Sequence, residues 1–198
     1  MQKLICGIDE AGRGTLCGSL FVAGVACSPE TATLLKNQGI KDSKTLTKTA
    51  RATLSTLIQS TPKLFFTIIE KTAAQIDSKG LSLCLKESIL SIIESLSPHA
   101  QDFYLDGNTT FHLRPTPPIT LSCLIKGDSL MPQISAASIL AKHAKDQEMT
   151  RLHSLYPDYD FINHAGYGTK AHLEKLASLG LTPHHRRSFK LKPPRSLF

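Results

Sequence analysis

The sequence predicts an α/β fold in which a mixed sheet is flanked by helices and followed by a small C-terminal helical region. Two observations predict the mixed sheet. Three strand-like segments within the first 71 residues favour an antiparallel meander. Two later strand-like segments are separated by helical or long connections, which favours parallel pairing.

Five strands are expected, because apolar, β-branched and aromatic residues predominate in five short segments. The first three, at 3–9, 16–27 and 63–71, would form the antiparallel meander. The last two, at 101–106 and 119–126, would be parallel neighbours. Each of these last two strands leads from apolar residues into an aspartate beside a glycine.

Two helices are expected in the first half of the chain, at 47–60 and 81–97. The second has apolar residues at helical spacing, and Pro98 follows it as a stop signal. Its periodic residues are Leu81, Leu85, Ile89, Ile92, Ile93 and Leu96.

Two further helices are expected in the second half. A long one is expected at 131–155, with Ser129 as its N-cap and Pro132 in its first turn. A shorter one is expected at 170–179, with Gly180 as its C-cap. The prediction thus divides the chain into a core at 1–155, a helical region of the same domain at 156–189, and a basic flexible tail at 190–198.

The composition is that of a globular protein, with 41% hydrophobic and 20% charged residues in 198. No apolar run approaches a membrane span, and the N-terminus has no signal-peptide pattern, so a soluble cytoplasmic protein is expected, most simply a monomer. The cysteines lack the spacing of zinc or disulfide motifs, which predicts buried free thiols. They are Cys6, Cys17, Cys27, Cys84 and Cys123.

The net charge of +7 is unevenly distributed along the chain. No acidic residue follows Glu174, whereas six basic residues do. A second basic cluster spans 36–51 and contains Lys44. Basic patches on an otherwise neutral chain suggest a polyanionic partner such as nucleic acid. Solvated surface explains such runs equally well, so charge alone leaves both interpretations open.

The strongest chemical signal is the pair Asp9 and Glu10, which ends an apolar run and leads into Gly12-Arg13-Gly14. A regular strand would send the two carboxylates to opposite faces, so they are expected to share a site because the strand ends there and the chain turns. A dinucleotide-binding loop is excluded, because a β-rich segment follows and the glycine spacing differs. Carboxylates beside phosphate also require a cation between them.

Asp106 and Asp128 are expected to join this pair, because each follows an expected strand beside a glycine. Either aspartate alone is better explained as a turn former, and only the joint pattern favours a site. Four carboxylates in one cleft would repel one another, so divalent cations are the natural counterions. Oxygen ligands favour Mg²⁺ or Mn²⁺, and the sequence therefore predicts a metal site that handles phosphate.

These motifs resemble the signature of type 2 ribonuclease H, ribonuclease HII, over almost the whole chain. The matching segments are Gly7-Ile8-Asp9-Glu10-Ala11-Gly12-Arg13-Gly14, Asp42-Ser43-Lys44, Asp106-Gly107, Lys126-Gly127-Asp128, Ala136 to Lys142, Gly166-Tyr167-Gly168-Thr169 and His185-Arg186-Arg187-Ser188-Phe189. The resemblance implies a ribonuclease H-like fold. It also implies an endonuclease that cuts the RNA strand of RNA/DNA hybrids and the 5′ side of single ribonucleotides in duplex DNA, with roles in ribonucleotide removal and primer clearance.

The resemblance also implies roles for individual residues. The four carboxylates Asp9, Glu10, Asp106 and Asp128 would bind two metal ions and carry catalysis, giving 3′-hydroxyl and 5′-phosphate ends. The backbone of Gly12, Arg13 and Gly14 would contact the ribose 2′-hydroxyl. Tyr167 would stack on the following deoxyribose. Lys44, Arg186 and Arg187 would hold phosphates.

Ser138 and Lys142 lie in a matching segment but stay outside the predicted catalytic set. A helix interior and an i,i+4 pairing of Lys142 with Asp146 would explain them without function. The chain departs from the family pattern at Thr15 to Gly18, and at Lys145, where arginine is common. Neither departure removes a predicted ligand.

One partner hypothesis and two competing functions complete the sequence-based predictions. The terminal Leu197-Phe198 resembles short peptides that bind sliding clamps, although the usual glutamine is missing. A type 3 ribonuclease H would be expected to carry an additional N-terminal domain, and Asp9 lies too near Met1 to allow one. A catalytically silent nucleic-acid-binding module on the same fold would be expected to lack one of the carboxylates, yet all four are present.

Overall fold

The computed structural model describes residues 4–40 and 46–190. At its centre is a five-stranded sheet with the order β3-β2-β1-β4-β5. β1 (Leu4–Ala11), β2 (Leu20–Cys27) and β3 (Phe65–Lys71) form the antiparallel meander that the sequence predicts.

The other two strands are parallel, which also confirms the prediction. β4 (Ala100–Asp106) pairs with β1, and β5 (Thr120–Leu124) pairs with β4. β2 is buried along its whole length, because it is the strand between β1 and β3 and both of its faces are covered.

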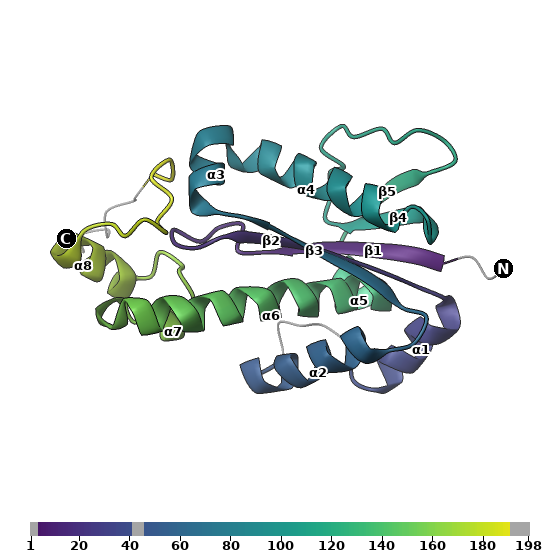
Figure 1. The fold of residues 1–198 in the computed structure, drawn as a ribbon, viewed down its shortest axis with the longest axis horizontal. Coiled ribbons are helices and arrows are strands. Elements are labelled where there is room, and N and C mark those ends of the chain that lie inside the picture. Colours follow the sequence, from purple (N-terminus) through teal and green to yellow (C-terminus); the bar gives the residue numbers. More distant parts are fainter. Residues whose placement is uncertain (1–3, 41–45, 191–198) are drawn as a thin grey trace.

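Helices cover both faces of the sheet (Figure 1). α3 (Ala73–Lys79) and α4 (Leu81–Leu96) pack on one face, against inward side chains of β1 and β2 such as Ile8 and Val22. α1 (Pro29–Asn37), α2 (Lys48–Ser60) and α6 (Pro132–Leu155) cover the other face. The result is the predicted mixed α/β architecture.

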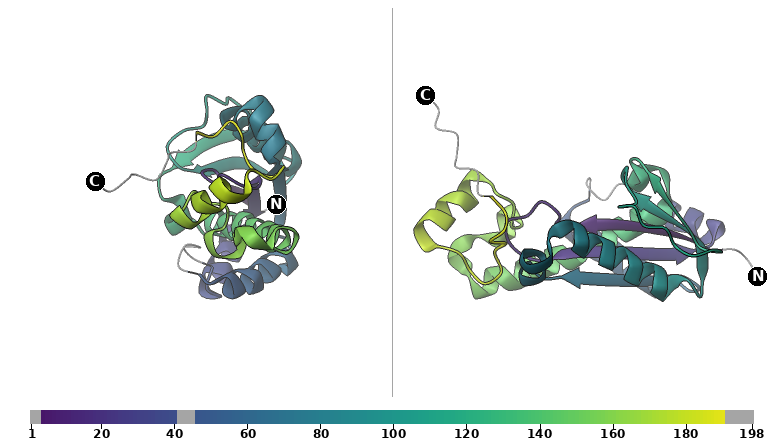
Figure 2. Two further views of the ribbon diagram at one scale, coloured as in Figure 1. Left: turned by 90° about the vertical axis from the view of Figure 1, so that its left-hand side faces the viewer. Right: turned by 90° about the horizontal axis from the view of Figure 1, so that it is seen from above.

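The C-terminal region lies at the end of the sheet opposite the first residues of β1 (Figure 2). A short α5 (Gly127–Leu130) leads into α6, and a 3-10 turn (Pro157–Tyr159), α7 (Phe161–His164) and α8 (Lys170–Leu179) follow it. A third apolar cluster joins this region to the end of α6 and to the β1–β2 loop. Its buried members are Cys17, Met149, Leu152, Tyr159, Phe161 and Leu176.

The four predicted helices are confirmed, and α8 ends at Gly180 as expected. The prediction that Ser129 caps the long helix is wrong. Ser129 lies inside α5, and Met131 is the N-cap of α6, with Pro132 as its first residue. α1, α3, α5 and α7 were not predicted from the sequence. Within the described residues, no helix combines the length and the apolar composition needed to cross a bilayer.

Candidate active site

Asp9 and Glu10 lie inside β1, which continues to Ala11 in its pairing with β2. The expectation that the strand ends at the two carboxylates is therefore wrong. The pairing of β1 with β4, however, stops at Ile8, which lies opposite Leu105. Because β1 extends past its neighbour, both carboxylates lie beside the end of β4 without a turn in β1.

Asp106 and Asp128 lie at this same end of the sheet. Asp106 is the last residue of β4, and its Oδ1 accepts a hydrogen bond from the backbone N–H of Gly127 at 2.7 Å. Lys126, with φ of 56°, turns the chain between β5 and α5. Asp128 follows in α5 and is buried, and the hydroxyl of Ser135 donates to its carbonyl oxygen at 2.6 Å.

Three of the carboxylates repel one another. Burial, together with the charges of Glu10 and Asp106, raises the pKa of Asp9 to about 7. Burial also raises the pKa of Glu10, against the lowering effect of Arg13, whose Nη1 lies 3.4 Å from Glu10 Oε1. Buried like charges of this kind are stabilised by a bound cation.

α6 runs along β1 and brings two further polar side chains to Asp9. A Cβ at Gly7 would overlap the backbone of Ile134, so α6 can approach β1 this closely only because residue 7 is glycine. Four residues of helix and two residues of strand both advance about 6 Å, which places Ser138 beside Asp9. Ser138 donates a hydrogen bond to the Asp9 carboxylate, and Lys142 Nζ donates to Ser138 Oγ at 3.0 Å.

Ser138 and Lys142 are therefore residues of the site that the sequence analysis left out. Asp146, which was expected to pair with Lys142, forms an ion pair with Arg51 of α2 at 2.7 Å. The usable signal was the spacing of Ser138 and Lys142, which puts both on one face of a helix. The sequence did not indicate that this face would meet β1.

The four carboxylates offer oxygen donors, which suit Mg²⁺ and Mn²⁺. Within the described residues, no three His, Cys, Asp or Glu side chains lie close enough together to form a finished metal site. The donors nevertheless fit a divalent cation by chemistry and by charge.

Gly12, Arg13 and Gly14 begin the β1–β2 loop and line a groove of about 340 Å³ together with Glu10 and other residues. Gly12 has a φ of +82°, and a Cβ there would overlap the carbonyl oxygen of Ser19, so this position requires glycine. A Cβ at Gly14 would meet nothing. The backbone at Gly14 is therefore open to a ligand in the groove.

Tyr167 lines the same groove and is 50% exposed. The segment that carries it is fastened to the β1–β2 loop, because Gly166 O accepts hydrogen bonds from the N–H groups of Leu16 and Cys17 at 2.8 and 3.2 Å. Tyr167 O accepts a hydrogen bond from Nδ1 of the buried His172 at 2.9 Å. Tyr167 and the glycine-bracketed arginine therefore line one groove.

Arg186 lies where a phosphate cannot reach it directly, contrary to its expected role. It is 2% exposed, and its guanidinium donates to three backbone carbonyls of the β1–β2 loop. Nε donates to Gly18 O at 3.0 Å, Nη1 to Arg13 O at 3.0 Å, and Nη2 to Gly12 O at 2.7 Å. Sequence reports the charge of an arginine but not its burial, which explains the error.

A buried ion pair supports the same loop from α6. Lys145 Nζ lies 2.8 Å from Glu148 Oε2 and donates to the carbonyl oxygens of Cys17 and Ser19, each at 3.1 Å. Glu148 accepts from the backbone N–H of Ser19 at 2.8 Å. Burial disfavours the charge of Glu148, but Lys145 outweighs it and holds the pKa of that carboxyl below its usual range. A Cβ at Gly18 would overlap both charged groups.

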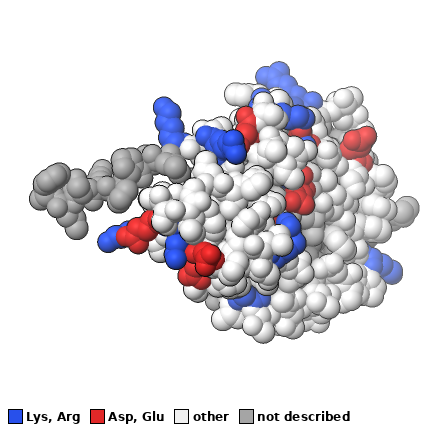
Figure 3. Space-filling view, turned by 60° about the vertical axis from the view of Figure 1, so that its left-hand side comes forward, with Lys and Arg blue, Asp and Glu red and all other residues white. Residues whose placement is uncertain are grey.

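The other two predicted phosphate contacts lie away from the groove or beyond the described chain. Lys44 lies outside the described residues, as do the basic residues from 191 onward. Arg187 is exposed, and its backbone N–H donates to Asp77 of α3 at 2.9 Å. On the face shown in Figure 3, Lys and Arg side chains are interspersed with Asp and Glu, so no single basic patch marks it.

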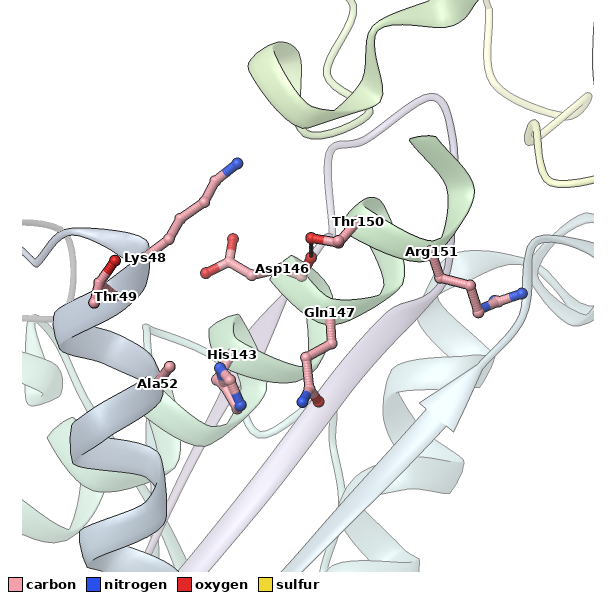
Figure 4. Close-up of a pocket in the computed structure, with 8 residues that line it drawn as sticks. All are labelled: Lys48, Thr49, Ala52, His143, Asp146, Gln147, Thr150 and Arg151. Carbon is pink, nitrogen blue, oxygen red and sulfur yellow. Dashed lines mark hydrogen bonds between the residues drawn. The ribbon is translucent and has the colours of Figure 1, made fainter. Parts of the chain in front are cut away.

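A second groove, of about 570 Å³, adjoins the first between α2 and α6 (Figure 4). The two share Lys48 and Asp146 as lining residues. Lys48 Nζ donates to the carbonyl oxygen of Ile162 and so ties α2 to α7. Asp146 is the only carboxylate among the lining residues of the second groove, and Arg51 neutralises it. The first groove is therefore the better candidate for the chemistry.

Comparisons with known proteins show which family and which fold the chain resembles. The family described as Ribonuclease HII matches residues 6–192. The chain is 49% identical over 186 residues to a ribonuclease HII from Helicobacter acinonychis, covering 94% of this chain and 96% of the relative. A solved complex of PCNA with ribonuclease HII from Archaeoglobus fulgidus is similar, with 28% identity, a TM-score of 0.77 and 96% of each chain covered. Bst-RNase HIII in complex with Mn²⁺ has the same fold, with 18% identity, a TM-score of 0.66, and 90% of this chain and 63% of that chain covered.

Proposed function

The chain belongs to the ribonuclease HII family, and from this membership we propose that it cuts the RNA strand of RNA/DNA hybrids and the 5′ side of single ribonucleotides embedded in duplex DNA. The observation that carries the proposal is the meeting of Asp9, Glu10 and Asp106 beside a groove lined by Gly12 to Gly14 and Tyr167. The carboxylates that would bind metal are thus adjacent to the backbone groups that would bind the substrate.

The carboxylates Asp9, Glu10, Asp106 and Asp128 would hold the divalent cations. The chemistry supplied by such ions when bound would be a lowered pKa for the attacking water and neutralisation of charge on the leaving 3′-oxygen. Ser138 orients the Asp9 carboxylate through its hydrogen bond, and Lys142 in turn orients Ser138. The donor set supports Mg²⁺ or Mn²⁺ equally, and a more distant protein of the same fold, Bst-RNase HIII, was solved with Mn²⁺.

Selection of RNA over DNA rests on the backbone of the β1–β2 loop. The groove lining at Gly12 and Gly14 lets a ribose come close to the main chain, whose polar groups can bond a 2′-hydroxyl. Tyr167 offers an exposed ring at the same groove, on which the sugar after the ribonucleotide would stack. Arg187, whose backbone is held by Asp77 and which is exposed, would hold a phosphate of the duplex.

The test is cleavage of a labelled DNA duplex that contains one ribonucleotide, beside an all-DNA duplex and a continuous RNA/DNA hybrid, in Mg²⁺, Mn²⁺ or a chelator. We expect a metal-dependent cut on the 5′ side of the ribonucleotide, leaving 3′-hydroxyl and 5′-phosphate ends, and no cut in DNA. Cleavage of the continuous hybrid alone would contradict the roles of the loop and Tyr167. Binding without any cleavage would favour the silent nucleic-acid-binding module.

The second part of the proposal concerns a partner. The end of the chain, Leu197-Phe198, lies outside the described residues, and its apolar pair follows a basic stretch. Such a segment can dock in an apolar pocket at a cost in ordering entropy. The similarity to a ribonuclease HII solved in complex with PCNA supports a sliding clamp as that partner.

We expect the full chain to bind the sliding clamp of its own cell, and the variant with Leu197→Ala and Phe198→Ala to lose that binding while it still cuts the one-ribonucleotide duplex. Surface plasmon resonance with immobilised clamp measures the first effect, and the cleavage assay is the control. Equal clamp binding by both proteins, or none by either, would rule the partner site out.

A further inference from the structure

We infer that Arg186 is a positioning residue that sets the orientation of the Gly12–Gly14 backbone, and that His172 and His185 hold Tyr167 in register with that backbone. The inference rests on the proposed function, because it concerns how the same groove distinguishes RNA from DNA. It gives Arg186 a role different from the phosphate contact that its charge suggested.

Arg186 orients two peptide groups of the β1–β2 loop. Its guanidinium draws the carbonyl oxygens of Gly12 and Arg13 inward, at 2.7 and 3.0 Å. In a trans peptide the N–H points opposite to the C=O. The N–H groups of the same two peptides, which belong to Arg13 and Gly14, therefore point away from Arg186.

Within the described chain, these two N–H groups are free to donate to a ligand. No described residue accepts a hydrogen bond from the backbone N–H of Arg13 or Gly14. Both residues line the groove, and the space beside Gly14 is open. Two successive backbone donors facing a groove can bind an oxygen of a ligand, such as the 2′-hydroxyl of a ribose.

The contacts at position 186 require an arginine and could not be made by a lysine. The planar guanidinium reaches three carbonyls in fixed directions, whereas an ammonium is a single flexible point. The guanidinium also lies over the Phe189 ring at 5.1 Å. Asp77 of α3 holds the chain next to Arg186, since Oδ2 and Oδ1 accept from the backbone N–H groups of Arg187 and Ser188, both at 2.9 Å.

Two histidines connect Tyr167 to the segment that carries Arg186. The Thr182 N–H donates to His185 Nδ1 at 2.9 Å, so His185 carries its proton on Nε2. That proton is donated to His172 Nε2 at 3.0 Å, and His172 Nδ1 donates to Tyr167 O. Each ring nitrogen thus has one defined role, and both rings are neutral. Arg186 follows His185 in the chain, so one short segment contacts the Gly12–Gly14 loop through Arg186 and His172 through His185.

The test is the charge-conserving substitution Arg186→Lys, compared with Arg114→Lys, a change at an exposed arginine of the 107–119 loop. A phosphate contact would survive Arg186→Lys, because lysine binds phosphate as a point charge. A positioning residue would not, so we expect kcat on the one-ribonucleotide duplex to fall on the order of 10²-fold. The Kd for the duplex and the salt dependence of binding are expected to stay unchanged.

Arg187→Gln provides the contrasting signature. As a phosphate contact, Arg187 is expected to weaken binding when lost and to reduce the slope of log K against log salt by about 1. If Arg186→Lys instead leaves kcat at the wild-type level, or changes Kd and the salt slope as Arg187→Gln does, the positioning role is wrong. Thermal unfolding of each variant separates a local effect from a general loss of folding.

Hydrogen exchange of the wild-type protein tests the inference without a variant, so it does not depend on whether a variant folds. The amides of Arg13 and Gly14 should exchange hydrogen rapidly in the free protein and become protected when a ribonucleotide-containing duplex binds without metal. Protection of both amides in the free protein would overturn the inference. If the wild type cuts no duplex while these amides exchange as expected, the proposed function fails and the loop geometry stands.

Discussion

Asp9→Asn is expected to lower cleavage of the one-ribonucleotide duplex by about 10³-fold or more and, at the same time, to stabilise the metal-free protein. The loss of activity follows because the substitution removes an anionic ligand from the centre of the carboxylate group, and a bound ion contributes several kcal/mol to the transition state. Single-turnover cleavage at saturating Mg²⁺ or Mn²⁺ measures it.

The gain in stability follows from the pKa of Asp9, which burial and then Glu10 and Asp106 raise to about 7. The unfolded chain ionises near pH 4, so folding disfavours the ionised form, and the metal-free wild type loses stability as the pH rises from about 4 through 7. Asparagine has no charge to lose. In chelator at about pH 8, we expect Asp9→Asn to raise the free energy of unfolding by on the order of 2 kcal/mol.

Asp158→Asn provides the control, because Asp158 is an exposed aspartate of the 3-10 turn. It should change neither cleavage nor the free energy of unfolding measurably. An Asp9→Asn protein that cuts at the wild-type rate would remove Asp9 from the metal site. A variant that is inactive but less stable than the wild type would show that Asp9 is an ordinary buried structural group.

Glu148→Gln is expected to destabilise the protein by about 3 kcal/mol, because it leaves the Lys145 ammonium buried without its counterion. Both residues are nearly inaccessible, with exposures of 5% for Lys145 and 6% for Glu148. The substitution also weakens the acceptor for the backbone N–H of Ser19, which anchors the far end of the β1–β2 loop. Urea-induced unfolding at neutral pH measures the loss.

The matched control is Glu174→Gln. Glu174 also pairs with a lysine, but the pair with Lys170 is 3.9 Å long and its side chains are 82% and 63% exposed. Water screens such a pair, so the loss should stay below about 0.5 kcal/mol. Equal and small losses in both variants would mean that the Lys145–Glu148 pair contributes no more than a surface ion pair.

Most of the sheet could be predicted from the sequence, because apolar and β-branched runs mark strands locally. Four helices were missed, and the two longer ones, α1 and α3, each have a capping signal. Ser28 caps α1 by accepting from the Thr31 N–H, with Pro29 as the first helical residue. Thr72 and Gln75 form a reciprocal capping box at the start of α3. Both helices are short and carry few apolar residues, so their periodicity alone is weak.

Errors in the site prediction have a common cause. Arg186 was expected on the surface because arginine is charged, and Asp9 and Glu10 were expected at a turn because two adjacent side chains of a strand point apart. In the fold, Arg186 is buried and yet paired, and Asp9 and Glu10 share a site without a turn between them. The fold buries Arg186 against three carbonyls, and it ends the pairing of β1 with β4 at Ile8, so that both carboxylates can approach Asp106.

The sequence by itself predicted the candidate residues for the chemistry: Asp9, Glu10, Asp106 and Asp128 after apolar strands, and two glycines around Arg13. It could do so because strand ends, glycines and carboxylates are local features. Only the tertiary structure decided which residues support them. Ser138 meets Asp9, and Arg186 meets Gly12, across separations of 129 and 174 residues that close only when α6 packs on β1 and the C-terminal segment folds back over the β1–β2 loop.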